Sequence, residues 1–240
     1  MIRFMFFLSI IILVFCISLS LIAKPYQNPY KLIMVFGKKG SGKTTFITKS
    51  ALTYIKKGVI VYSTIYVPGA RIFNVEDIGK FQFEPDSVIF VDEVGMIWDN
   101  RQYQKFRTDV RDWFKLQRHY RNTVYLFSQT FDIDIKLRNL CDAMYLLKNH
   151  FGILSVARRI RRSIVIVSPQ GDSESRIADN LEFEPLILQI FGYKSIIFTW
   201  IPNWVKYFDS FSTPELPKMP YYQSFFPIPI HIYFKKIGSK

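Results

Sequence analysis

The sequence predicts an α/β fold, in which a mostly parallel sheet is flanked by helices and preceded by one N-terminal transmembrane helix. Three observations predict it: a twenty-residue apolar run near the N-terminus, short apolar runs that alternate with helical patterns, and a glycine-rich loop between the first such run and the first helix. We expect three parts: a membrane anchor at 1–24, a globular domain at 25–175, and an extension rich in proline and aromatic residues at 176–240.

The composition agrees with one globular domain that carries appendages. Hydrophobic residues make up 49% and aromatic residues 17% of the 240 residues, which is enough for a sizeable core. The net charge of +13 indicates an anionic partner, either nucleic acid or a lipid surface, although solvated lysines and arginines would give the same value. The two cysteines, Cys16 and Cys141, provide no disulfide framework, which is typical of a reducing compartment.

The first element is the apolar run at 4–23, which contains no charged residue. As a helix, its twenty residues span about 30 Å, the thickness of a bilayer core. A cleaved signal peptide and a buried core helix are the alternatives, and Ser18-Leu19-Ser20 weakly resembles a cleavage site. Lysines follow the run closely, whereas only Arg3 precedes it, so the positive-inside rule favours a cytoplasmic C-terminal side.

A strand at 32–36 leads into the glycine-rich loop and then a helix at 44–57. The loop matches G-x-x-x-x-G-K-[ST], the phosphate-binding P-loop, in its strand–loop–helix setting. Backbone N–H groups and the helix N-terminus would surround the phosphates of ATP, Lys43 would reach the outer ones, and the Thr44 hydroxyl would ligate Mg²⁺. The nucleotide-binding residues are therefore Gly37, Lys38, Lys39, Gly40, Ser41, Gly42, Lys43, Thr44 and Thr45. The need for ATP also favours an uncleaved anchor with the domain in the cytoplasm.

Two further strands supply candidate catalytic groups. A short strand is expected at 59–62, and a buried one at 87–91 ends in Asp92-Glu93. Ligands bind at the carboxyl edge of parallel sheets, so Asp92 would hold Mg²⁺ together with Thr44, and Glu93 would polarise the attacking water. A strand that runs into a solvated acidic turn is the alternative.

The segment at 101–120 predicts a helix with one apolar stripe, and a buried strand follows at 123–127. The basic residues of this helix would face DNA, act on a neighbour's phosphate, or be solvated. The strand ends in Ser128-Gln129, where a polar pair would bind the γ-phosphate or orient the water, or form an ordinary turn. Lys43, Glu93 and Gln129 are thus the candidate catalytic residues.

The rest of the chain carries weaker signals. A short helix is expected at 132–140 and a strand at 143–147. Apolar runs at 153–156 and 164–167 predict a hairpin whose tip holds four arginines, suited to phosphate backbones or anionic headgroups: Arg158, Arg159, Arg161 and Arg162. Residues 169–173 would close the domain. The apolar stretch at 186–201 is interrupted by Gln189 and Lys194, which favours a membrane-surface or docking segment over a second span.

Residues 31–149 resemble the zonula occludens toxin (Zot) family, which includes the assembly ATPases of filamentous phages and belongs to the FtsK/HerA group of P-loop ATPases. The likeness is carried by the motifs at 37–44, 88–93, 113–119, 124–129, 132–134 and 136–138. The resemblance implies a P-loop NTPase of the ASCE, RecA-like class, with the Ser-Gln strand between the loop strand and the Asp-Glu strand. It also implies a homo-oligomeric ring, such as a hexamer, in which an arginine acts on the neighbour's nucleotide; Arg118 and Arg138 are the candidates.

The resemblance has departures, because family members often place the ATPase before the membrane span. We expect a membrane-anchored ATPase that drives assembly, export or packaging of filamentous (inovirus-like) phage single-stranded DNA at the host inner membrane. Its partners would be single-stranded DNA or phage coat and assembly proteins. A nucleotide-dependent scaffold of an envelope complex and a conjugative DNA-transfer ATPase are the alternatives. A GTPase is disfavoured because the base-reading N/T-K-x-D motif is missing from the sequence.

Overall fold

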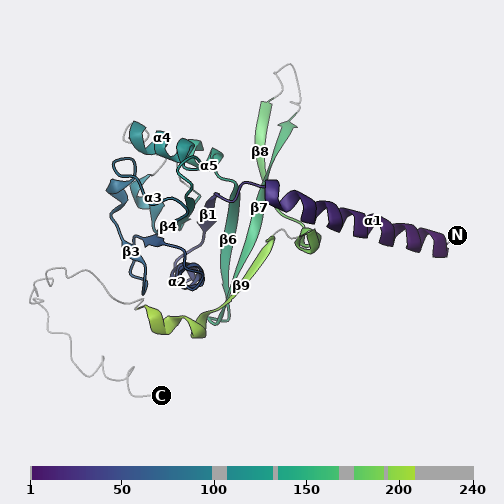
Figure 1. The fold of residues 1–240 in the computed structure, drawn as a ribbon, viewed down its shortest axis with the longest axis horizontal. Helices are drawn as coiled ribbons and strands as arrows, with labels where there is room; N and C mark the ends of the chain where they lie inside the picture. Colours follow the sequence, from purple (N-terminus) through teal and green to yellow (C-terminus); the bar gives the residue numbers. More distant parts are fainter. Residues whose placement is uncertain (1, 99–106, 132–134, 168–175, 192–193, 209–240) are drawn as a thin grey trace, which may run out of the picture. The chain divides into compact units, whose positions relative to one another are not determined.

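A computed structural model describes residues 2–98, 107–131, 135–167, 176–191 and 194–208, all within one compact unit, Met1–Ser210. In this part of the chain the strands form one nine-stranded sheet with the order β3-β2-β4-β5-β1-β6-β7-β8, and β9 pairs with β7 (Figure 1). The sheet continues past residue 175, where the sequence predicted the end of the globular domain.

The first six strands form the parallel half of the sheet. Their bounds are Leu32–Phe36 for β1, Val61–Ser63 for β2, Arg71–Ile72 for β3, Val88–Val91 for β4, Thr123–Ser128 for β5 and Ala143–His150 for β6. Neighbouring strands here pair in parallel, and all four residues of β4 are buried. β5 lies between β1 and β4, as the family resemblance implied. This order is that of the predicted ASCE class.

The remaining strands, β7 (Leu154–Val167), β8 (Arg176–Phe183) and β9 (Ile196–Trp200), form the antiparallel half. The predicted hairpin with an arginine tip is wrong, because β7 runs without a break through 158–162. Buried Ala157 and Ile160 join the cores on opposite faces of the sheet and hold this stretch in the strand. The turn lies at 151–153 instead, where Phe151 and Gly152 have positive φ.

The predicted helices lie close to where the sequence placed them, but their lengths differ from the prediction. They are α1 (Ile2–Ala23), α2 (Lys43–Ile55), α3 (Val94–Ile97), α4 (Thr108–Leu116) and α5 (Ile135–Asn139), with short 3-10 helices at Lys24–Tyr26, Val75–Asp77, Leu186–Phe191, Ile201–Asn203 and Val205–Tyr207. Residues 101–106 and 132–134, where two predicted helices begin, lie outside the described residues, as does the closing segment at 169–173. The predicted apolar stripe of α4 is confirmed at Val110, Trp113 and Phe114, which are all buried.

Each face of the sheet has its own apolar core. Side chains alternate along β1, so Met34 joins the core that contains Trp113 and Phe114 of α4, whereas Val35 joins the core under Phe46 and Ile47 of α2. Met34, Val35 and Ile47 are fully buried. The two cores therefore fix β1 and α2, and with them the loop that joins these two elements.

The helix α1 is long and apolar enough to cross a membrane by length and composition. Its window Phe6–Ala23 has a mean hydropathy of 2.9 and is 0% buried. A signal sequence near an N-terminus has the same properties, so this alternative stays open. The second apolar stretch, 186–201, forms a 3-10 helix and β9 rather than a spanning helix. The two cysteines are free, as the sequence predicted.

Candidate nucleotide-binding site

The glycine-rich loop lies between the carboxyl end of β1 and the N-terminus of α2. Two of its glycines, Gly40 and Gly42, have φ of 78° and 95°, in the left-handed region that disfavours side chains. A Cβ on Gly37 would lie 2.4 Å from Ser41 Oγ, and a Cβ on Gly42 would lie 2.9 Å from Ser155. The loop thus needs glycine for backbone conformation and for space. Lys38, Lys39 and Gly40 are all exposed at the surface of the loop.

Two buried polar groups inside the loop suit an anionic ligand. Lys43 is only 8% exposed, and its Nζ donates a hydrogen bond to the Gly37 carbonyl over 2.9 Å. Ser41 Oγ is buried without a hydrogen-bond partner in the described part of the chain. Buried polar groups are normally paired, so these donors fit a phosphate held by the loop. Thr44 and Thr45 begin α2, where the helix N-terminus adds its positive dipole end.

The predicted catalytic carboxylate is held at this loop. Glu93 is the second residue after β4 and occupies the N-cap position of α3, with φ 51° and ψ 39°. This left-handed conformation is unusual for a non-glycine residue and clusters at functional sites. Its Oε1 accepts a hydrogen bond from Gln129 Nε2 over 2.8 Å and lies 3.8 Å from Lys43 Nζ. The structure therefore brings together the three side chains that the sequence proposed as catalytic: Lys43, Glu93 and Gln129.

Asp92 sits beside Glu93 in a desolvated position. Burial, with a smaller contribution from the Glu93 carboxylate, raises the pKa of Asp92 to about 6, and the Glu93 amide and Lys43 act in the opposite direction. No cluster of three or more histidine, cysteine or acidic side chains suited to a metal occurs among the described residues. The donor set fits the P-loop type of magnesium site, in which one Asp and one Ser/Thr, here Asp92 and Thr44, join the nucleotide phosphates around the ion.

Three supporting residues were not predicted from the sequence. Asp92 N donates to the Thr64 hydroxyl over 2.9 Å. Asn149 of β6 donates to the Gly40 carbonyl over 3.0 Å, and buried Ser155 of β7 donates to the Ser41 carbonyl over 2.8 Å. Each is an isolated polar residue in a loop or strand. Such a residue indicates no function in the sequence alone, and only the fold shows that it supports the nucleotide site. Asn149 and Ser155 face each other where β6 and β7 pair, and together they hold the phosphate loop from the side.

The candidate trans-acting arginines, Arg118 and Arg138, lie in different parts of the fold. Arg118 is exposed in the turn before β5, and β5 begins opposite the start of β1, so Arg118 lies at the sheet edge opposite the phosphate loop. Arg138 on α5 donates to the Phe131 carbonyl over 3.3 Å. A role of either arginine on a neighbouring subunit stays a prediction.

The four arginines of β7 point to both faces of the sheet, because neighbouring side chains along a strand alternate. Arg158 stacks over the Phe183 ring, with 4.3 Å from Cζ to the centroid. Arg159 and Arg161 lie 3.7 Å and 3.8 Å from Glu184 and Glu182, and Arg162 donates to Asn139. All four thus have partners within the chain, and their contact with DNA or lipid stays a hypothesis.

Comparison with known proteins supports the resemblance. Residues 76–174 match the family model described as zonular occludens toxin (Zot). The resemblance to the Zot family is confirmed. The Zot match includes Asp92, Glu93 and Gln129 and begins after the phosphate loop. No curated protein matches the sequence.

Several solved structures are similar at low sequence identity. The N-terminal domain of zonular occludens toxin from Neisseria meningitidis is 15% identical, with 67% of this chain and 97% of that chain covered and a TM-score of 0.39. The genome packaging NTPase B204 from Sulfolobus turreted icosahedral virus 2 in complex with AMPPCP is 14% identical, with 52% and 77% covered and a TM-score of 0.42. The flagellar accessory protein FlaH from Methanocaldococcus jannaschii is 13% identical, with 54% and 77% covered and a TM-score of 0.43. With its strand order and loop, this Zot-like chain has the predicted P-loop NTPase fold.

Proposed function

We propose that the protein is a membrane-anchored ATPase whose turnover drives assembly, export or packaging of filamentous phage single-stranded DNA. The observation that carries the ATPase assignment is the Glu93 carboxylate, which lies between β4 and α3 beside the phosphate loop and contacts both Gln129 and Lys43. A carboxylate fixed at this place is suited to activate a water molecule against a bound γ-phosphate.

The side chains of the site have separable roles in this proposal. Lys43 exchanges the Gly37 carbonyl for an outer phosphate of ATP, and the loop amides bind the inner ones. Glu93 accepts a proton from the attacking water, and the amide of Gln129 fixes the Glu93 carboxylate. Thr44 and Asp92 would hold Mg²⁺, which neutralises charge on the phosphates when it is bound.

A pair of lysine variants tests the nucleotide site. Lys43→Ala should lose ATP binding by roughly tenfold or more and abolish turnover, because a buried, charge-assisted contact to phosphate is removed. Lys56→Ala removes an exposed lysine at the C-terminal end of α2, outside the loop, and should keep most of both. ATP binding by titration calorimetry and phosphate release measure the two effects. Wild-type turnover in Lys43→Ala would reject the assignment.

The phage role is supported by the Zot match over residues 76–174 and by the net charge of +13, which suits a nucleic-acid partner. A DNA motor should hydrolyse ATP faster when single-stranded DNA is added, and the stimulation should weaken as salt rises. If no nucleic acid stimulates turnover, the scaffold function is favoured. Neighbouring coat-protein genes would separate the phage role from a conjugative DNA-transfer role.

The proposed location is the cytoplasmic membrane, with α1 as a single-pass anchor and the ATPase domain in the cytoplasm. The apolar window Phe6–Ala23 and the lysines that follow it support this arrangement. The chain should stay in the membrane fraction after alkaline extraction and should resist protease added to intact spheroplasts. A mature N-terminus near Ser20 would identify a cleaved signal sequence instead.

A further inference from the structure

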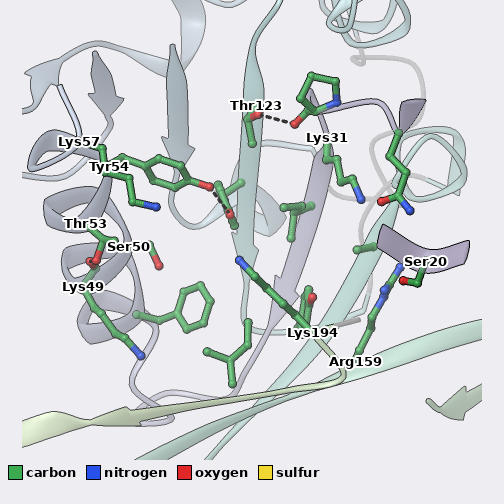
Figure 2. Close-up of a pocket in the computed structure, with 18 of the residues that line it drawn as sticks. Ser20, Lys31, Lys49, Ser50, Thr53, Tyr54, Lys57, Thr123, Arg159 and Lys194 are labelled. Carbon is green, nitrogen blue, oxygen red and sulfur yellow. Dashed lines mark hydrogen bonds between the residues drawn. The ribbon is translucent and has the colours of Figure 1, made fainter. Parts of the chain in front are cut away.

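A cavity of about 670 Å³ lies on the α2 side of the sheet, away from the nucleotide site. It is lined by the strand starts around Lys31, Thr123 and Ala143, whereas the phosphate loop follows the opposite, carboxyl end of β1. The side chains of α2, of β7 and of the segment before β9 surround the same space (Figure 2). Its volume is in the range of small-molecule sites, so it is a second site candidate.

The lining of this cavity is strongly cationic. It includes five basic residues and no acidic residue among those that the structure describes: Lys31, Lys49, Lys57, Arg159 and Lys194. Figure 2 shows Lys49 and Lys57 on α2 and Lys194 and Arg159 across the space from them. Arg159 lies 3.7 Å from Glu184, but Lys31, Lys57 and Lys194 have no acidic partner within 4.0 Å in the described part of the chain. The lysines therefore offer charge to an external anion.

The floor of the cavity is apolar and aromatic. Ile33, Phe46 and Ile197 contribute to it, and the hydroxyls of Tyr54 and Tyr125 share a hydrogen bond of 3.1 Å (Figure 2). Cations around an apolar floor suit an anionic amphiphile better than a fully hydrated ion. Lys49 Nζ donates to the Phe198 carbonyl and to the Thr199 hydroxyl, and burial lowers its pKa, so this lysine adds charge to the lining rather than a free donor.

The cavity is also close to the end of the apolar helix along the chain. Gln27, Pro29 and Lys31, which belong to the linker after α1, line it, and so do Ser20 and Leu21 of α1 itself. If α1 spans the membrane, these linker residues lie at the headgroup level of the cytoplasmic leaflet. Clusters of lysine and arginine at that level attract anionic lipids.

We propose that this cavity binds the phosphate-bearing headgroup of an anionic phospholipid of the cytoplasmic leaflet. The lysines pair with the headgroup phosphate, and the apolar floor contacts the start of the acyl chains. The inference rests on the proposed membrane anchoring, and it does not depend on ATP hydrolysis. A bound lipid would hold the ATPase domain against the membrane through a surface other than the anchor.

The test uses the full chain in a neutral detergent and native mass spectrometry, with three probes: phosphatidylglycerol, phosphatidylcholine with the same acyl chains, and inorganic phosphate. We expect saturable binding of phosphatidylglycerol, roughly tenfold tighter than phosphatidylcholine, because the lysines attract the net negative charge of its headgroup. Equal affinity for the two lipids would overturn the proposal. Binding of inorganic phosphate as tight as that of phosphatidylglycerol would assign the cavity to a soluble anion instead.

Two variants locate the binding. Lys31→Gln with Lys194→Gln should remove the preference for phosphatidylglycerol, whereas Lys56→Gln with Lys206→Gln removes the same charge at exposed lysines outside the lining and should keep it. Ser50→Trp fills the cavity from α2 without a change of charge and should also lose the lipid. Retained ATP binding shows that each variant is folded. An equal loss in both lysine pairs would contradict the site. A wild-type chain that binds the lipid but hydrolyses no ATP would reject only the ATPase proposal.

Discussion

The two halves of the sheet differ in what they give to the nucleotide site. In the parallel half, β1, β4 and β5 end in the phosphate loop, in Asp92-Glu93 and in Ser128-Gln129. The antiparallel half instead supplies a single buried contact, from Ser155 of β7 to the Ser41 carbonyl. The parallel half thus holds the reacting groups, and the antiparallel half fixes the loop on which they act.

The largest expected effect comes from a substitution where the two halves meet. Gly42→Ala combines a positive φ of 95° with a Cβ only 2.9 Å from Ser155, so we expect a loss of about 2 to 4 kcal/mol in the free energy of unfolding. Gly40→Ala has a φ of 78° and nothing within 4 Å of its Cβ, so it should lose about 1 to 2 kcal/mol from the backbone alone. Urea unfolding of both variants measures the difference.

The double variant Gly42→Ala with Ser155→Gly separates crowding from backbone strain. It should lose less stability than the sum of the two single substitutions, because the atoms nearest to the new Cβ are those of the Ser155 side chain. If Gly40→Ala and Gly42→Ala are equally destabilised, the close contact between the loop and β7 does not affect the free energy of unfolding.

The second largest effect is expected from the buried carboxyl group of Asp92 in the parallel half, and it depends on pH. The pKa of Asp92 is raised to about 6 in the folded protein. The protonated carboxyl group therefore contributes fully to the free energy of unfolding below the ordinary pKa of an aspartate, and this contribution is lost as the pH rises through 6. Asp92→Asn should therefore stabilise the nucleotide-free protein by about 1 to 3 kcal/mol at pH 8 and have little effect near pH 4.

Asp86 is the matched control, because hydrogen bonds from Tyr30 and Arg121 lower its pKa. Asp86→Asn should change stability in the opposite direction at pH 8. Thermal unfolding of both variants at the two pH values measures the effects. A lower melting temperature of Asp92→Asn at pH 8 would contradict the raised pKa.

A smaller effect is expected in the antiparallel half. Ser155→Ala leaves the Ser41 carbonyl without its buried donor, which should lower the free energy of unfolding by about 1 to 2 kcal/mol and weaken ATP binding severalfold. Ser163→Ala, the same substitution farther along β7, should stay within about 0.5 kcal/mol of the wild type. Equal ATP affinities in the two variants would show that β7 does not support the loop.

The parallel half could be predicted from the sequence because its function lies in contiguous motifs. The loop at 37–44 and the acids after β4 follow short buried strands, and parallel pairing then brings them to one edge. The same logic placed Gln129 and Glu93 at one edge of the sheet, although the hydrogen bond between them was not predicted.

The antiparallel half could not be predicted in this way. The arginine cluster resembled a hairpin tip, because four charges in five residues rarely lie within a strand. Two buried apolar residues, Ala157 and Ile160, do not reveal from the sequence that this stretch is paired on both sides. Its neighbour is β6 on one side and either β9 or β8 on the other. Ser155 belongs to no motif, and its role depends on long-range strand pairing that a local pattern does not encode. The same is true of Thr64 and Asn149 in the parallel half.

The most direct test of the central claim is ATP hydrolysis in Glu93→Gln. Single-turnover hydrolysis should fall by about 100-fold or more, because the amide cannot accept a proton from the attacking water. ATP affinity should change little, since Lys43 and the loop are intact. Glu182→Gln, the same substitution in the antiparallel half, should hydrolyse ATP at the wild-type rate. Hydrolysis by Glu93→Gln at the rate of the wild type would contradict the account.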